Sequence, residues 1–208
     1  MMYLARIDME MSAIRVRAAL SDSQKMHRLL TGLYQDSRQG VSLLYRVKTN
    51  GRTVSVYQYA SRPVRKENIG PGMSLGGERC LDGWLDSMQT GQTWGFDLVT
   101  MPFKKERRSD SGNSRRRMLR DEEERLEWLF RKAEQNGFAI LDVQEIKDEK
   151  MNIYHPSDKG GKMVMDSYRY TGIMTIKDVS AFRKAVQEGI GPGKAYGLGM
   201  LLLKRQMN

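Results

Sequence analysis

Hydrophobic and polar positions near the start of the chain predict a strand followed by a helix. Residues 3–11 alternate in part between apolar and polar side chains, which is the period of a strand. From residue 21 the period becomes that of an amphipathic helix, which we expect to begin at a cap within residues 21–23 and to end near Gly40. The apolar stripe of this helix consists of Met26, Leu29, Leu30, Leu33 and Tyr34.

The rest of the first half predicts a hairpin and further strands. Two strand-like runs, 42–48 and 53–59, flank an Asn50-Gly51 pair, which is a strong hairpin signal. Residues 62–79 are rich in glycine, proline and charge, which indicates a loop or a poorly formed second helix. The remaining strand candidates are 81–88 and 93–102.

A second succession of helices and strands follows a boundary that we place near residue 91. Acidic residues at 121–124, an apolar stripe behind them and Gly137 predict a helix. Further strands are expected over 138–146, 162–176 and 200–203, with a helix over 180–188. The chain therefore predicts an α+β fold with two domains of similar topology, residues 1–90 and 91–208.

The excess of basic residues favours a polyanionic partner. The net charge alone is equally compatible with a soluble protein that has a basic surface and no such partner. The 208 residues include 35 Lys and Arg against 25 Asp and Glu, a net charge of +10. More than half of that excess lies in residues 104–120, which contain eight basic and two acidic residues. The clustering is what makes nucleic acid the favoured partner.

Cysteine, histidine and apolar content exclude several classes of protein. A lone Cys80 cannot form an internal disulfide, and no Cys/His set has the spacing of a zinc site. Charged residues interrupt the first part of the chain, so it lacks the continuous apolar core of a signal peptide. No apolar run approaches the length of a membrane span. We expect a cytoplasmic protein without metal or cofactor.

A glycine-rich stretch, GIGPGKAYGLG at residues 189–199, precedes the last strand. It is not a nucleotide-binding P-loop, because Glu188 and Ala195 stand where that motif needs glycine and a hydroxyl. Two interpretations stay open. The glycines allow positive φ in a turn, or they let backbone amides approach phosphate beside Lys194.

Several segments together resemble the CasE family, the CRISPR repeat endoribonucleases of type I-E Cascade within the glycine-rich RAMP superfamily. GIGPGKAYGLGMLLL is similar to the glycine-rich loop and closing strand of that family. MYLARI, MHRLLTGLY, ERLEWLFRKAEQNGF and SYRYTGIMTIKD follow the family's order, so that the resemblance spans essentially the whole chain.

This resemblance implies two tandem ferredoxin-like (RRM-like) domains and an RNA-processing activity. Such enzymes bind the stem-loop of CRISPR repeat RNA, cut at the 3′ base of the stem without metal, and remain with the product as a Cascade subunit. His27 occupies the catalytic histidine position, which suits proton transfer at a ribose 2′-OH. Familiar members of the family carry a tyrosine three residues earlier, where this chain has Gln24. Gln24 and Tyr34 are the two candidates for a role that supports catalysis by His27.

The RNA-binding candidates are basic side chains and the glycine-rich stretch. Individually each charge is more simply interpreted as solvated, but on so basic a chain phosphate binding is favoured for the set. The residues are Arg28, Lys104, Lys105, Arg107, Arg108, Arg115, Arg116, Arg117, Lys159, Lys162, Gly191, Gly193 and Lys194.

Two alternatives to the endoribonuclease remain at this point. The substitution of Gln24 for the usual tyrosine motivates a non-catalytic RNA-binding RAMP subunit of a CRISPR ribonucleoprotein. Charge alone supports an unrelated nucleic-acid-binding protein.

Overall fold

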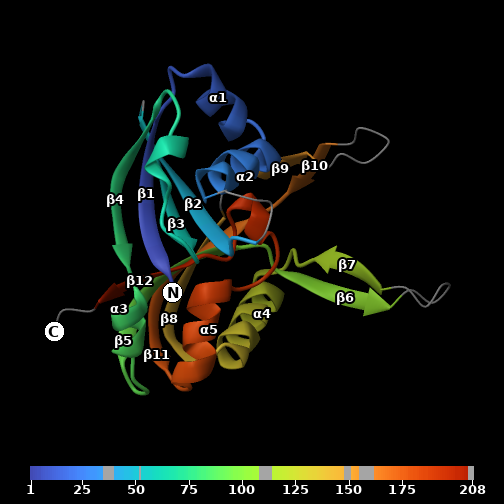
Figure 1. Ribbon diagram of the computed structural model, residues 1–208. Coiled ribbons are helices and arrows are strands. Elements are labelled where there is room, and N and C mark those ends of the chain that lie inside the picture. Colours follow the sequence, from blue (N-terminus) through green and yellow to red (C-terminus); the bar gives the residue numbers. More distant parts are fainter. Residues whose placement is uncertain (35–39, 52, 108–113, 148–150, 155–161, 206–208) are drawn as a thin grey trace.

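The computed structural model describes residues 1–34, 40–51, 53–107, 114–147, 151–154 and 162–205 (Figure 1). Within these residues, two four-stranded antiparallel sheets are each covered by helices on one face. The predicted α+β class is therefore confirmed.

The first sheet is built from the N-terminal part of the chain. Its strand order is β2-β3-β1-β4. The strands are β1 (Tyr3–Glu10), β2 (Leu43–Asn50), β3 (Thr53–Ala60) and β4 (Met73–Cys80). Helices α1 (Ile14–Leu20) and α2 (Ser23–Thr31) pack on one face, where Met26 and Leu30 meet Ile7, Val54 and Val56. Burying this stripe holds α2 at a fixed place above the sheet.

The second sheet has the order β12-β5-β11-β8, which repeats the pattern of the first. Its strands are β5 (Thr93–Thr100), β8 (Phe138–Lys147), β11 (Tyr168–Ile176) and β12 (Leu201–Arg205). Helices α4 (Glu122–Gln135) and α5 (Val179–Glu188) cover one face, with Trp128, Leu129 and Phe182 in the core. Asp121 and Asp178 cap these helices, since each carboxylate accepts two backbone N–H groups.

Two hairpins project from the same side of the molecule as α2 in the view of Figure 1. One pairs β6 (Phe103–Arg107) with β7 (Ser114–Met118), and the other pairs β9 (Met151–Tyr154) with β10 (Lys162–Met165). The short helical elements are α3 (Asp82–Asp86), η1 (Gly32–Tyr34), η2 (Lys66–Asn68) and η3 (Lys194–Tyr196).

Two sequence expectations in the first half are wrong. Residues 62–79 contain η2 and most of the edge strand β4, whose side chains are nearly all exposed, so that no apolar alternation marks it. Residues 81–88 hold helix α3 in place of a strand, because Leu81, Leu85 and Met88 are buried at helical spacing.

Boundaries also differ from those expected. Helix α1 was not predicted, and α2 ends at Thr31 rather than near Gly40. The strand expected over 162–176 is divided between β10 and β11. Within the charged run 104–120, residues 104–107 and 114–118 form most of the β6–β7 hairpin, which the charge pattern alone did not predict.

Side chains from both sheets meet between the two halves. Asp97 on β5 forms ion pairs with Arg46 of β2 at 3.1 Å and with Arg169 of β11 at 2.6 Å. Leu44 of β2 belongs to the same buried cluster as Phe96 of β5. In the part of the chain that the structure describes, no helix is long and apolar enough to cross a membrane.

Candidate active site

Helix α2 places His27 at the border between the core and solvent. Asp22 caps the helix by accepting the backbone N–H of Gln24 at 2.9 Å, and Met26 faces the core. His27 follows Met26 and is half-buried, at the edge of the apolar stripe where the sequence predicted it. The imidazole is therefore held by packing while part of it stays accessible.

Tyr45 of β2 supports the imidazole from inside the protein. The two rings are stacked, with centroids 6.5 Å apart and an interplanar angle of 28°. Tyr45 is only 1% exposed. Its hydroxyl donates to the carbonyl oxygen of Ala195 at 3.1 Å and lies 3.5 Å from that of Ser23. One buried ring thus touches His27, the start of α2 and the glycine-rich stretch.

The glycine-rich stretch folds against α2 and β2, with its short helix η3 beside α2. All five glycines adopt positive φ: Gly189, Gly191, Gly193, Gly197 and Gly199. A Cβ at Gly191 would lie 2.5 Å from Oγ1 of Thr100, and one at Gly193 would lie 2.7 Å from Leu198. Folding therefore accounts for these glycines, so any phosphate-binding role rests on Lys194 and on the place of the loop near His27.

Burial perturbs the chemistry of His27. It lowers the pKa of the imidazole from its ordinary value of 6.5, and burial is the only cause of the shift. Nδ1 is buried and has no hydrogen-bond partner among the described residues. At neutral pH this histidine is therefore mainly uncharged, the form that can accept a proton.

The other candidates near α2 are placed differently. Gln24 is half-buried in the first turn of α2 and Arg28 is exposed. Tyr34 is 3% exposed, and its hydroxyl donates to Oε1 of Gln58 at 2.8 Å in the core. Burial raises the pKa of Tyr34 far above its usual range, which leaves it unsuited to proton transfer. The structure thus argues against the supporting role suggested for Tyr34.

The basic candidates of the β6–β7 hairpin whose side chains are described fall into two groups. Lys104 and Lys105 are exposed on β6. Arg117 on β7 pairs with Glu106 at 2.5 Å and with Glu124 of α4 at 3.0 Å. It fastens the hairpin to α4, so its charge is less available to RNA than the sequence suggested.

The remaining basic candidates lie wholly or partly outside the described residues. Arg108 and Lys159 fall in undescribed segments. Arg107, Arg115, Arg116 and Lys162 lie in strands, but their side chains are not described.

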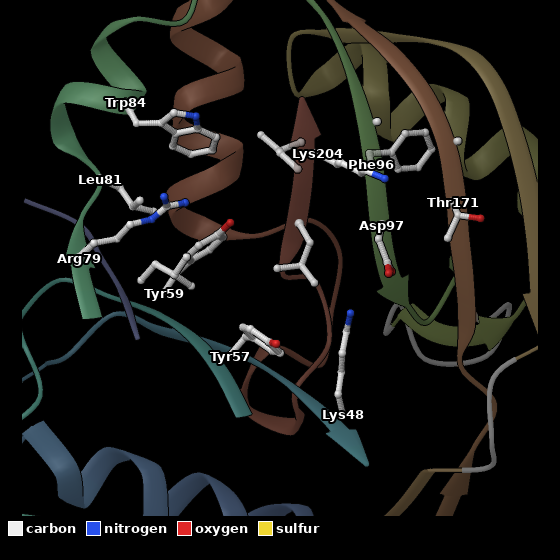
Figure 2. A pocket seen from close by; sticks show the side chains of 15 residues that line it. Lys48, Tyr57, Tyr59, Arg79, Leu81, Trp84, Phe96, Asp97, Thr171 and Lys204 are labelled. Atoms are coloured by element: carbon white, nitrogen blue, oxygen red, sulfur yellow. The ribbon is translucent and has the colours of Figure 1, made fainter. Parts of the chain in front are cut away.

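A separate cleft of about 610 Å³ lies between the two sheets (Figure 2). Figure 2 shows Lys48, Arg79 and Lys204 around it, with the rings of Tyr57 and Trp84. Lys48 is three residues from Tyr45 on β2, so their side chains project from opposite faces of the sheet. The cleft is therefore distinct from the His27 site.

Sequence reasoning missed Tyr45 entirely. In one dimension it is an aromatic residue in a strand, a common core position. Its contacts with His27 and Ala195 join residues separated by 18 and by 150 positions, and no local motif marks such contacts.

Comparison with known proteins gives consistent results. Residues 2–205 match the family described as CRISPR associated protein. The CRISPR system Cascade subunit CasE of Escherichia coli is 35% identical over 123 residues, which cover 56% of this chain and 60% of that protein. The CRISPR-associated endoribonuclease Cse3 of Thermus thermophilus is 27% identical over 124 residues, which cover 55% of this chain and 57% of that protein.

The aligned part of the chain thus spans less than two thirds of the length of either relative. Structural similarity extends further. A structure of Thermus thermophilus Cse3 bound to an RNA representing a pre-cleavage complex aligns with a TM-score of 0.82 and 22% identity, and the alignment covers 98% of each chain. The resemblance to CasE inferred from the sequence is confirmed.

Proposed function

The chain belongs to the CRISPR-associated protein family, and from this premise we propose that it is a metal-independent endoribonuclease of CRISPR repeat RNA. It binds the repeat stem-loop and cleaves the precursor at the 3′ base of the stem, leaving a 2′,3′-cyclic phosphate and a 5′-OH. It then stays bound to the mature RNA as a subunit of a cytoplasmic Cascade complex. The names of CasE and Cse3 support both the activity and the assembly.

One observation carries the proposal: the half-buried imidazole of His27 lies on α2, which packs against both η3 and strand β9. A ribonuclease without metal needs a proton acceptor near the scissile phosphate and positive charge around it. His27 supplies the acceptor. Arg28 follows His27 on α2, and Lys194 lies on η3, which packs against α2. We assign the positive charge to these two side chains.

In this mechanism, neutral His27 takes the proton of the ribose 2′-OH through Nε2, since Nδ1 is buried. The 2′ oxygen attacks the adjacent phosphorus, and the bond to the 5′ oxygen of the next nucleotide breaks. Water protonates that leaving oxygen. Lys194 and Arg28 stabilise the negative charge that develops on the phosphoryl oxygens.

We assign the two halves to tandem ferredoxin-like domains, residues 1–90 and 91–208. When the four strands of each half are numbered along the chain, their spatial order in the sheet is 4-1-3-2. Helices connect the strands in the βαββαβ order, and in the first half the short η2 takes the place of the second helix. The catalytic helix belongs to the first domain and the glycine-rich stretch to the second. RNA held between them would contact both.

Cleavage of a repeat hairpin in EDTA tests the function. The wild-type protein is expected to cut a hairpin RNA at one position beside the stem and to leave a control RNA of the same composition without a stem intact. Tight hairpin binding without cleavage would instead support the non-catalytic subunit. Equal affinity for both RNAs would reject hairpin recognition altogether.

The cleavage rate should rise with pH because neutral His27 is the active form. Burial lowers its pKa, so the neutral form already predominates by about pH 7. Single-turnover rates at saturating protein are expected to increase between about pH 5 and pH 7 and then level off. A rate that falls over this interval would show that the protonated imidazole is required.

Charge on the β6–β7 hairpin should contribute to RNA binding. The double variant Lys104→Ala/Lys105→Ala is expected to weaken hairpin binding and to reduce the slope of log K against log salt by about 1.5, roughly 0.7–0.9 for each lost phosphate contact. Lys177→Ala/Lys184→Ala removes two exposed lysines at α5 and serves as the control. An unchanged slope in the first variant would remove these lysines from the interface.

A further inference from the structure

We propose that Tyr45 is a positioning residue that holds the His27 imidazole and links it to the glycine-rich stretch. This inference rests on the proposed function of His27. Tyr45 does not reach the surface, being 1% exposed, so it acts on RNA only through its neighbours. Its contacts join three separate segments of the chain: β2, α2 and η3.

The Tyr45 ring limits where the imidazole can go. The rings are nearly parallel, at 28°, with centroids 6.5 Å apart. Neighbouring core side chains fix Tyr45, which belongs to the same buried cluster as Met26 and Leu30 of α2. Because an accessible histidine on a helix edge could otherwise rotate into solvent, this support restricts His27 to few orientations.

The Tyr45 hydroxyl ties that support to the glycine-rich stretch. It donates to the carbonyl oxygen of Ala195 at 3.1 Å, next to Lys194. Burial raises the pKa of Tyr45 far above its usual range, so the hydroxyl keeps its proton and acts as a hydrogen-bond donor. It therefore does not replace the proton-transfer role of the tyrosine that is missing at Gln24.

Gly197 brings the glycine-rich stretch against the same ring. Its φ is +84°, and a Cβ at this position would lie 2.8 Å from Cε2 of Tyr45. Any larger residue would push the ring or the loop away. Tyr45 thus contacts both His27 and the segment that carries Lys194, and through that segment it would place a phosphate held by Lys194 relative to the imidazole.

Kinetics of three variants test the proposal. Tyr45→Leu should lower the single-turnover cleavage rate about 100-fold, the effect of a misplaced catalytic group, while hairpin affinity changes by less than about threefold. Tyr45→Phe keeps the ring and loses only the hydroxyl, so we expect a rate reduced by roughly fivefold. Partial rescue by phenylalanine separates support by the ring from the hydrogen bond.

Tyr59→Leu is the matched control for loss of a buried ring. Tyr59 is 5% exposed on β3 and points into the cleft of Figure 2, on the opposite face of the sheet from Tyr45. We expect it to lower thermal stability to a similar degree and to leave the cleavage rate near that of wild type. An equal loss of rate in both leucine variants would overturn the proposal.

The pKa of His27, measured by NMR, gives a readout that does not depend on cleavage. Removing the Tyr45 ring exposes the imidazole, so its pKa should rise toward 6.5 in Tyr45→Leu and stay unchanged in Tyr45→Phe and Tyr59→Leu. His155→Gln identifies the signal of the other histidine. Ionisable residues on α2, on the ring partner of His27 and on the described elements that pack against α2 are Lys25, Arg28, Tyr45, Arg15, Arg17, Tyr34, Lys194 and Tyr196.

The two readouts distinguish failure of this proposal from failure of the proposed function. If the wild-type protein binds the hairpin without cutting it, the proposed function fails, and the NMR comparison still decides whether Tyr45 holds the imidazole. If Tyr45→Leu cleaves at the wild-type rate and His27 keeps its pKa, Tyr45 is not a positioning residue.

Discussion

Replacing His27 with alanine is expected to lower the cleavage rate by about 10³-fold, within the range that proton transfer by a positioned side chain contributes. The variant loses the half-buried imidazole above Tyr45 but none of the exposed lysines of the β6–β7 hairpin. Hairpin affinity should therefore stay within about threefold of the wild-type value. Single-turnover cleavage and filter binding of the same labelled RNA measure the two quantities.

His155→Ala is the control of the same residue type and should cleave at the wild-type rate. If His27→Ala retains wild-type cleavage, another group transfers the proton. If it loses affinity and rate together, His27 contributes to binding rather than to chemistry.

The largest expected effect on stability comes from Arg125, which joins α4 to β8. Its guanidinium pairs with Glu145 at 2.5 Å, lies 4.1 Å from the centre of the Tyr168 ring and donates to the carbonyl oxygen of Arg120. Both charged side chains are only 8% exposed. Arg125→Leu leaves Glu145 buried without its partner, so the free energy of unfolding should fall by about 3–5 kcal/mol.

Urea unfolding of three variants separates this effect from general disruption of α4. Arg117→Leu breaks ion pairs that are about 40% exposed and should shift the unfolding midpoint far less. The double variant Arg125→Leu/Glu145→Gln should recover part of the loss, because no buried charge is left alone. A double variant less stable than Arg125→Leu would show that an unpaired buried charge on Glu145 is not the cause of the loss.

The elements predicted correctly are those whose local signals agree with their packing. The strand over 3–11, the hairpin at Asn50-Gly51 and the helix before Gly137 combine a clear period with a cap or turn residue. Strand β4 has no such signal, because as an exposed edge strand it is held by pairing with β1 rather than by burial. Its existence depends on a partner about 70 residues away.

The candidate site could be predicted only in part for a similar reason. Resemblance identified His27, and the helical period placed it at a boundary position, where it lies. The roles of Tyr34 and Arg117 depended on partners that no period indicates: Gln58 in the core for the first, and Glu106 with Glu124 for the second. The role of Tyr45 could not be predicted, because its contacts with His27, Ser23 and Ala195 form only in the folded chain.

A repeat hairpin with a single 2′-deoxy nucleotide on the 5′ side of the scissile bond tests the central claim most directly. The account predicts that the wild-type protein binds this RNA in EDTA as tightly as the all-ribose hairpin and does not cut it, while the all-ribose product ends in a 2′,3′-cyclic phosphate. Cleavage of the deoxy-substituted hairpin at the same bond would contradict the account, because the nucleophile could not then be the 2′-OH that His27 is proposed to deprotonate.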